Sequence, residues 1–338
     1  MPSGPQACVL PNCFCSKDGQ APPGNLLPST VPQFIVLTFD DAVNDPHLFN
    51  PNGHPIKATF FISHEWTDYN EVEWIAERGH EIASNSITHA SLAKANLTEW
   101  TSEMDGQRQV LAEFGNVAED SIVGMRTPQL AMGGDQQFEM MQRAGFVYDN
   151  SMSVNSENMP YCSYPGIWEI PMNQFHGLGN LRSAMVRGAV ENDASVEDIT
   201  NVLFNNFQRA YTTNRAPYVL SLNADFLQLG GGDRGMQALN RFLTNMRNHP
   251  DVYFITLKNL VKWMQAPVPL SQISQFLEIN DQTPQQDYLQ KDSSSRRCAT
   301  PNKCLYPTPF LPSTEHQFLT CHACPPLFPW LHNPAGLL

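Results

Sequence analysis

The chain has 338 residues, of which 41% are hydrophobic, so it can bury the core of one large domain or of two small ones. Its formal net charge of −13 argues against nucleic acid and anionic lipid as partners. No apolar run approaches the roughly 20 residues that a membrane span requires. A neutral or cationic ligand, such as a carbohydrate, is compatible with this charge.

Strand and helix patterns alternate along the chain from about residue 33 to residue 257. Such alternation, about seven times over about 230 residues, implies a parallel sheet with crossover helices. So many units favour a closed or nearly closed barrel, and no G-x-G-x-x-G motif follows the first strand to suggest dinucleotide binding. In chain order the expected elements are strand 33–39, strand 57–63, helix 70–79, strand 80–84, helix 97–115 opened by Thr98, strand 121–128, helix 134–145, extended 146–152, strand 166–175, helix 195–214, strand 217–226, helix 235–249 and strand 251–257.

Composition divides the chain into three parts. Residues 1–30 are rich in Cys, Pro and Gly and are expected to pack on the barrel, which we place at 31–265. Residues 266–338 hold a polar linker, "QTPQQDYLQKDSSSRR", and a Cys- and Pro-rich extension without a core of its own.

The eight cysteines cluster near the two ends of the chain. The absence of a paired C-x-x-C motif disfavours a zinc ribbon and favours disulfides formed in an oxidising compartment, although the sequence does not fix their pairing. The sequon Asn96-Leu97-Thr98 fits secretion, and "MPSGPQACVL" is interpreted as a mature or truncated start because it has no signal-peptide pattern. The cysteines are Cys8, Cys13, Cys15, Cys162, Cys298, Cys304, Cys321 and Cys324.

Polar side chains stand at the expected carboxyl ends of the first and third strands, where barrels carry their chemistry. Asp40 and Asp41 end the first strand, and adjacent carboxylates there point to opposite sides. Asn85 and His89 follow the third strand, and residues four apart on a helical turn share a face and can reach one metal ion. The competing interpretations are a strand-terminal turn for the two aspartates and a polar helix start capped by Asn85 or Ser86.

Three further residues follow or occupy later strands. Arg126 is either half of a surface ion pair or a bidentate support for a catalytic carboxylate. Trp168 is either a core residue or a wall on which a sugar stacks. Asn223 ends the strand at 217–226.

These residues, in this order and spacing, resemble the metal-dependent polysaccharide deacetylases of the NodB type, and more closely the arthropod chitin deacetylases. The resemblance rests on "LPNCFCSKDG", "FIVLTFDDAVN", "PIKATFFISHEWT", "RGHEIASNSITH", "VGMRTPQLAMGGDQQFEMMQRAGFVYDNSM", "WEIPMNQF" and "DVYFITLKNLVKWMQ". It implies an α/β fold of the distorted (β/α) barrel type, hydrolysis of N-acetyl groups from chitin, and secretion.

The resemblance also implies roles for single residues. In such a hydrolase a divalent metal, expected to be zinc, polarises the acetamide carbonyl and lowers the pKa of its water. The implied roles are general base for Asp40, metal ligand for Asp41 and for His89, orientation of the base for Arg126, a backbone N–H of the oxyanion hole for Gln129, and a substrate-facing aromatic for Trp168.

Two positions depart from the family pattern at the implied site. Asn85 replaces the first histidine ligand, and Asn223 replaces the histidine that serves as general acid; the segment 42–57 is also shorter than usual. An amide oxygen is a weaker zinc ligand than imidazole, and general acid catalysis is typically worth about 10²–10⁴-fold. Whether His54, His64 or His80 compensates is left open by the sequence.

Two functions follow. The first is a secreted enzyme: a monomeric zinc-dependent chitin deacetylase of reduced activity that acts on chitin or chito-oligosaccharides. The alternative is a catalytically impaired chitin-binding protein on the same barrel, which the joint departure at Asn85 and Asn223 would allow.

Overall fold

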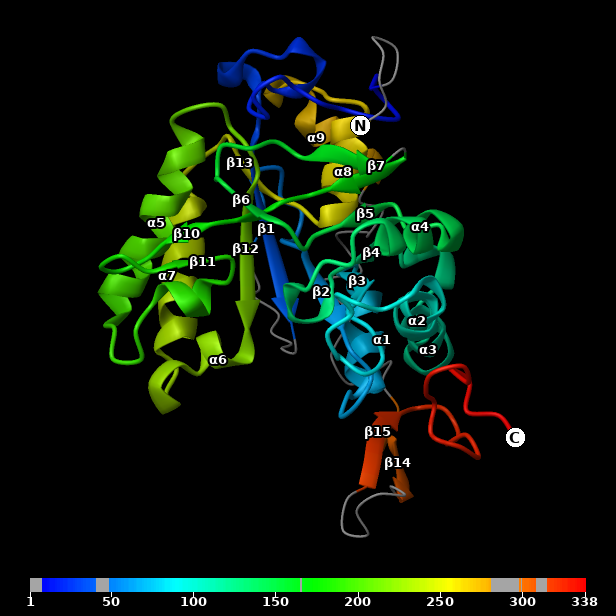
Figure 1. Ribbon diagram of the computed structural model, residues 1–338. Coiled ribbons are helices and arrows are strands. Elements are labelled where there is room, and N and C mark those ends of the chain that lie inside the picture. The colour runs from blue at the N-terminus through cyan, green and yellow to red at the C-terminus, as the bar shows by residue number, and fades with distance from the viewer. Residues whose placement is uncertain (1–7, 41–48, 165, 281–297, 299, 308–314) are drawn as a thin grey trace. The chain divides into compact units, whose positions relative to one another are not determined.

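The computed structural model describes residues 8–40, 49–164, 166–280, 298, 300–307 and 315–338 (Figure 1). The chain forms two compact units, one from residues 1–59 and 150–282 and the other from 60–149 and 283–338. Asp41 and the linker expected at 282–297 lie outside the described residues. The three-part division expected from composition stays a prediction.

The first unit is built on a parallel arrangement around β1, Gln33–Asp40, every residue of which is buried except the last. β12, Tyr218–Asn223, pairs with β1 along six consecutive positions, and β13, Val252–Phe254, pairs with its first half (Figure 1). A strand buried on both faces reads as a continuous apolar run, which is the pattern of "FIVLTF". The shorter strands of this unit are β6 Ser153–Val154, β7 Tyr161–Tyr164, β8 Ile167–Glu169, β9 Met172–Asn173, β10 Phe175–His176 and β11 Arg182–Ser183.

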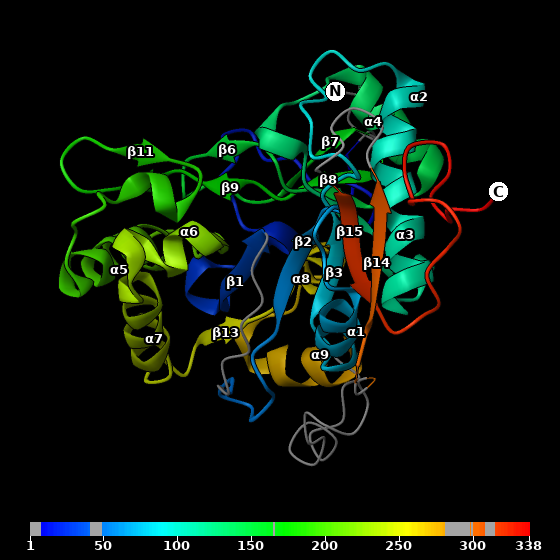
Figure 2. The same cartoon turned by 90° about the horizontal axis from the view of Figure 1, so that it is seen from below.

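Two amphipathic helices, α5 and α7, pack against each other in this unit (Figures 1 and 2). Their buried stripes meet β12 through Phe207, Tyr218 and Phe242, whose ring centroids lie 5.9–6.1 Å apart. Edge-on aromatic packing of this kind stabilises beyond the area that it buries. The helices are α5 Val196–Tyr211, α6 Ala224–Leu227, α7 Arg234–Met246, α8 Leu257–Gln265 and α9 Ile273–Asn280.

The second unit holds a run of short parallel strands. β2, Ala58–Ile62, extends into it from the unit boundary and is followed in the sheet by β3, β4 and β5. β3 pairs with β4 in parallel at Ser84 and Met125, and β4 pairs with β5. The other elements are β3 Glu81–Ser84, β4 Gly124–Met125, β5 Tyr148–Asp149, α1 Tyr69–Glu77, α2 Leu97–Trp100, α3 Gly106–Gly115 and α4 Asp135–Ala144.

The helix expected over 97–115 is present but is not one regular α-helix. α2 and α3 are joined by a π-helical turn, Thr101–Asp105. The N-cap of α2 is Asn96 rather than Thr98. The Asn96 side chain accepts hydrogen bonds from the backbone N–H groups of Thr98 and Glu99, and the Glu99 carboxylate accepts one from the backbone N–H of Asn96. This reciprocal pair is a capping box, so the start of the helix is fixed locally.

The C-terminal extension packs into the second unit as a hairpin of β14, Asn302–Pro307, and β15, Glu315–Thr320 (Figure 2). Phe318 on β15 is 1% exposed and lies between Tyr69 of α1 and Phe114 of α3, at 5.7 and 5.2 Å between ring centroids. The hairpin therefore shares the core of this unit.

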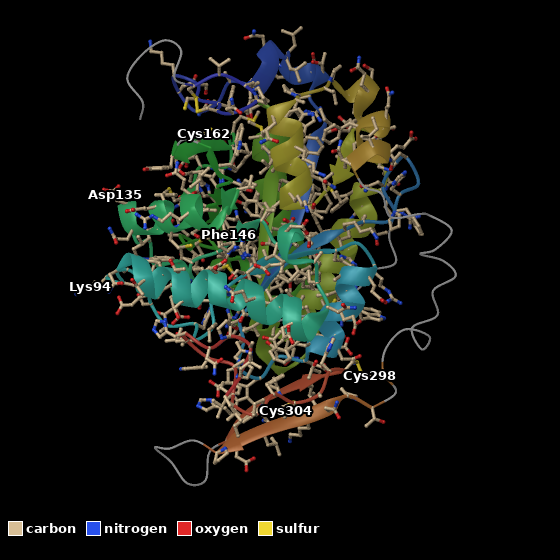
Figure 3. All side chains as sticks on the ribbon, turned by 90° about the vertical axis from the view of Figure 1, so that its right-hand side faces the viewer. Lys94, Asp135, Phe146, Cys162, Cys298 and Cys304 are labelled. Atoms are coloured by element: carbon tan, nitrogen blue, oxygen red, sulfur yellow. A yellow bond between two sulfur atoms is a disulfide. The ribbon has the colours of Figure 1, made fainter. Side chains whose placement is uncertain are left out.

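Disulfides close the extension, as the cysteine pattern predicts. Cys298 is bonded to Cys321 and Cys304 to Cys324, and a third bond joins Cys8 to Cys13 (Figure 3). Cys15 and Cys162 are not in a disulfide. In the described part of the chain, every helix is too short or too polar to cross a bilayer.

Candidate functional site

The residues expected at the site are divided between the two units. Asp40, Trp168 and Asn223 belong to the first unit; Asn85, His89, Arg126 and Gln129 belong to the second. Each group is therefore described within its own unit, and the roles expected of all these residues stay predictions. Asp41 lies outside the described residues.

In the first unit, Asp40 and Asn223 occupy matching positions at the carboxyl ends of neighbouring strands. The register of β1 on β12 ends with Asp40 opposite Asn223. Both side chains are half-buried, unlike the fully buried positions before them. The pairing places a carboxylate and an amide side by side at the edge where barrel chemistry occurs.

Asn223 also has a structural task. Its Oδ1 accepts a hydrogen bond from the backbone N–H of Phe226 at 3.0 Å and so caps α6. Asn is among the best capping residues, and an imidazole would not replace it in this role. The amide at position 223 therefore stabilises the turn that follows the strand.

Trp168 lies in β8 and is 1% exposed. It is one of the largest fully buried side chains of the described chain, and it pairs with Cys162 on β7. This burial agrees with the core interpretation; a part in substrate binding stays a prediction.

In the second unit, residues 85–89 form a loop and not the helical turn that the four-residue spacing suggested. That expectation was wrong because Ser86 and His89 adopt left-handed backbone angles, with φ of 69° and 55°. Left-handed φ at non-glycine residues is uncommon and concentrates at functional sites. The turn closes through the Ser86 hydroxyl, which accepts the backbone N–H of His89 at 3.0 Å.

Glu103 holds this loop in place. One carboxylate oxygen accepts the backbone N–H groups of Ile87 and Thr88 at 3.0 and 2.9 Å, and the other accepts the Thr88 hydroxyl. Glu103 is 4% exposed and comes from the π-helical turn. Hydrogen bonds to a buried carboxylate are stronger than neutral ones, so Glu103 anchors the loop.

Sequence reasoning did not find Glu103, although a signal was present. Glu103 lies at helical spacing between the buried Trp100 and Gln107 and is flanked by the buried Met104. A carboxylate on the apolar stripe of an amphipathic helix needs a buried partner, because an unpaired buried charge is costly.

Asn85 presents an unpaired acceptor. Its backbone N–H donates to the carbonyl of Ile62 at 3.0 Å, which ties the loop to β2. Its side chain is 2% exposed, and Oδ1 accepts no hydrogen bond from any described residue. A buried amide oxygen without a donor is costly unless a cation or a ligand N–H or O–H completes it.

A divalent metal fits the chemistry of two donors on this loop, the Asn85 amide oxygen and the His89 imidazole. The half-exposed His89 stands on the same loop as Asn85 and supplies an imidazole, and its backbone carbonyl accepts a hydrogen bond from the Gln129 side chain at 3.4 Å. An amide oxygen and an imidazole are both known ligands for divalent first-row metals, the amide being the weaker.

Arg126 is buried at 1% exposure directly after β4. Its guanidinium lies 4.1 Å above the Phe61 ring, and its backbone N–H donates to Ser84 at 3.0 Å. Arg is the cation that best tolerates such burial and stacking.

A buried pair next to Arg126 was also missed from the sequence. The Tyr148 hydroxyl donates to Glu81 at 2.8 Å. Burial, and then the negative charge of Glu81, raise the pKa of Tyr148 well above its usual value, while Arg126 opposes that shift. Tyr148 therefore stays protonated and serves as a fixed donor.

Gln129 follows Pro128 in a short 3₁₀ turn with a left-handed φ of 57°. It is exposed, and its backbone N–H donates to no other described residue. An N–H of this kind can stabilise a developing oxyanion, and this role of Gln129 stays a prediction.

Two of the three histidines that were left open as substitutes, His64 and His80, have other surroundings. His64 is fully buried, bonded to the Tyr69 hydroxyl at 2.7 Å and stacked on Phe328 of the C-terminal segment. Burial lowers the pKa of His64 to about 3. His80 is 5% exposed and packs edge-on against Phe60, which agrees with its core interpretation.

The described residues contain one cluster of three side chains at metal-binding distances, Cys8, Cys13 and Cys15, within 4.8 Å of one another. Cys8 and Cys13 are already joined by a disulfide, so two of its three sulfurs are unavailable as thiolates. This agrees with the disulfide interpretation of the cysteines.

Comparisons with known proteins identify similar deacetylases. A family described as Polysaccharide deacetylase matches residues 28–149. Chitin deacetylase 1 of Bombyx mori is 31% identical over 380 residues, covering 99% of this chain and 68% of the relative. Chitin deacetylase 8 of Bombyx mori is 29% identical over 372 residues, covering 99% of this chain and 93% of the relative.

A solved structure shares the fold at low identity. The probable polysaccharide deacetylase from Pseudomonas aeruginosa PAO1 superposes with a TM-score of 0.50 at 16% identity, covering 69% of this chain and 91% of that one. The predicted fold class, an α/β fold of the distorted-barrel deacetylase type with a disulfide-tied C-terminal extension, is confirmed.

Proposed function

This chain belongs to the polysaccharide deacetylase family, and we propose that it is a secreted, metal-dependent hydrolase of the N-acetyl groups of chitin or chito-oligosaccharides, with reduced activity. The resemblance noted in the sequence is confirmed by the near-complete match to two chitin deacetylases. The observation that carries the proposal is the anchored loop 85–89, which holds a buried, unpaired Asn85 oxygen and the half-exposed His89.

The metal would be held by Asp41, Asn85 and His89. When bound, a divalent ion such as zinc polarises the acetamide carbonyl and lowers the pKa of water. The chain contributes the shape of the loop: Glu103 fixes the backbone of Ile87 and Thr88, so the two donors of the loop are positioned before any metal binds.

Asp40 is assigned the general base, since it is a half-buried carboxylate at the end of β1. Arg126 is assigned the orientation of that base, and the backbone N–H of Gln129 the stabilisation of the oxyanion. Trp168 would shape the substrate side from within the core rather than by stacking on a sugar.

Asn223 accounts for the reduced rate. The leaving amine needs a proton, and an amide that caps α6 has none to give near neutral pH. The loss of general acid catalysis is expected to lower the rate by about 10²–10⁴-fold.

The cysteines support the proposed extracellular compartment. Three disulfides join six of the eight cysteines, and disulfides persist in oxidising environments. An extracellular monomer acting on a neutral sugar polymer is consistent with the net charge of −13.

The second candidate is a chitin-binding protein without catalysis on the same fold. It is favoured by the capping role of Asn223, which explains the amide at this position without any catalytic task. This function predicts retention on chitin that chelators do not change.

Acetate release from a chitin oligomer, with zinc supplied and then chelated, tests the first function on the fully disulfide-bonded chain. Zinc-dependent release that disappears in Asp40→Asn supports the enzyme. Absence of release, together with chelator-independent retention on chitin, supports the binding protein, and failure of both contradicts both.

A further inference from the structure

The sequence contains one Asn-X-Ser/Thr sequon, Asn96-Leu97-Thr98, and the proposed reaction gives it no task. We propose that Asn96 carries an N-linked glycan in the secreted protein. The sequon stands at the N-terminus of α2 in the second unit, and its three residues are among the described ones.

The geometry leaves one atom of Asn96 free for the linkage. The side chain is exposed, and its Oδ1 accepts the N–H groups of Thr98 and Glu99 at 2.9 and 3.1 Å. Among the described residues, the Nδ2 atom of Asn96 has no acceptor and thus faces no competing partner. N-glycosylation uses Nδ2 and leaves Oδ1 as a carbonyl, so the modified residue keeps its role as cap.

The transfer balances with a co-reactant of the secretory pathway. Nδ2 bonds to C1 of a lipid-pyrophosphate-linked oligosaccharide, the bond from C1 to the pyrophosphate oxygen breaks, and lipid pyrophosphate leaves as Nδ2 gives up one proton. No oxidant or reductant is involved, and the disulfides agree with the same oxidising secretory route.

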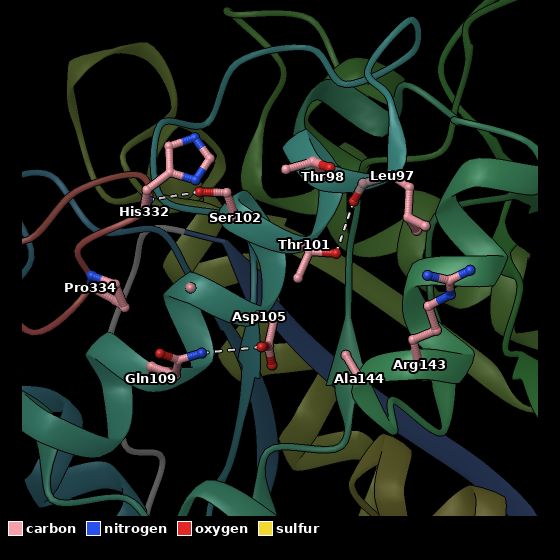
Figure 4. Close-up of a pocket in the computed structure, with 11 residues that line it drawn as sticks. Leu97, Thr98, Thr101, Ser102, Asp105, Gln109, Arg143, Ala144, His332 and Pro334 are labelled. Carbon is pink, nitrogen blue, oxygen red and sulfur yellow. Dashed lines mark hydrogen bonds between the residues drawn. The ribbon is translucent and has the colours of Figure 1, made fainter.

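The folded protein has room for saccharide beside this position. Leu97 and Thr98 line an open groove with a volume of about 570 Å³, and Figure 4 shows both at its upper end. Polar groups continue along it, with Thr101, Asp105 and Gln109 on the helix. The groove begins at the two residues that follow Asn96 and offers hydroxyl, carboxylate and amide groups to a sugar attached there.

The capping box allows variants that remove the glycan and keep the fold. Thr98→Val destroys the sequon while Asn96 still caps the helix, since only the backbone N–H of Thr98 takes part in the cap. Asn96→Asp removes the amide nitrogen to which the glycan is attached. It keeps a capping oxygen, because Asp caps as well as Asn. Thr98→Ser keeps the sequon and is the matched control.

The experiment is the expression of the full chain behind a cleavable secretion leader in insect cells, followed by intact-mass measurement of the protein from the medium. We expect a mass above that of the unmodified chain, removed by a peptide N-glycosidase that leaves a heavy-oxygen-labelled Asp at position 96 in labelled water. Thr98→Ser should keep the added mass, and Thr98→Val and Asn96→Asp should both lose it.

The proposal is overturned if the secreted wild-type chain has the mass of the unmodified sequence, or if the added mass persists in both sequon variants. Because Asn96→Asp and Thr98→Val remove the glycan by different routes, poor folding of one of them does not decide the result. Acetate release is measured separately, so failure of the proposed enzyme and failure of this proposal are distinguishable.

Discussion

Glu103→Ala should release the loop that carries Asn85 and His89. In the native chain the Glu103 carboxylate accepts three hydrogen bonds, from the N–H groups of Ile87 and Thr88 and from the Thr88 hydroxyl. The variant leaves these donors without an acceptor, and Ile87 is buried, so water cannot replace the lost bond there.

The magnitude follows from the number and burial of these bonds. A hydrogen bond to a charged group contributes about 1.5–3 kcal/mol, and a buried unsatisfied donor costs about 1–3 kcal/mol. Since Thr88 is half-exposed and can be hydrated, the expected loss of unfolding free energy is about 3–5 kcal/mol. Glu103→Gln keeps one acceptor oxygen and the shape of the side chain and should lose about 1–2 kcal/mol.

Two measurements are needed: urea unfolding for stability and zinc titration for the loop. Glu103→Ala should weaken zinc binding by about 10-fold or more, as expected when a ligand loses the group that orients it. Glu113→Ala is the matched control, because Glu113 is an exposed carboxylate on α3, and it should change stability by less than about 0.5 kcal/mol. A stability loss in Glu103→Ala no larger than in Glu113→Ala, or unchanged zinc affinity, would refute the anchoring role.

Four other predictions address the site and the core. Asn85→His should raise zinc affinity by about 10–100-fold in a titration, and an unchanged affinity would show that position 85 is not a ligand. Asn223→His should raise acetate release by about 10²–10⁴-fold while the Phe226 N–H loses its cap, at about 1 kcal/mol of stability; Asn223→Asp, which keeps the cap, should leave the rate low. His64 has a folded pKa of about 3 against an ordinary 6.5, so below pH 6.5 only the unfolded chain takes up the proton. Stability should therefore fall by about 1.4 kcal/mol per pH unit between those values, and pH-dependent unfolding of His64→Gln should lack this contribution. Phe318→Ala should cost about 3–5 kcal/mol in urea unfolding, and a cost below about 1 kcal/mol would show that the hairpin is not part of the core.

Much of the secondary structure was predictable because its signals are local. The apolar run before Asp40 is a buried strand, and the patterns at 195–214 and 235–249 correspond to α5 and α7. The strand expected at 121–128 is shorter in the structure, and the one expected at 166–175 is divided among β8, β9 and β10, because strand length depends on the neighbour that pairs with it.

The candidate site was only partly predictable. The positions of Asp40 and Asn223 at strand ends could be read from the chain, and their register follows from the parallel pairing. The loop at Asn85 could not, because its left-handed backbone angles at Ser86 and His89 occur in a loop that is bonded through Ile87 and Thr88 to Glu103, which lies well beyond it in sequence.

The sequence by itself determined the α/β class and the family, since side-chain periodicity and motif order depend on residues near one another in the chain. Tertiary structure decided which cysteines pair, that Phe318 enters the core between Tyr69 and Phe114, and that the Asn85 oxygen is buried without a donor. These features require residues that are distant in sequence to meet, and the free energy of closing such loops is balanced only by the packing and hydrogen bonds of the complete fold.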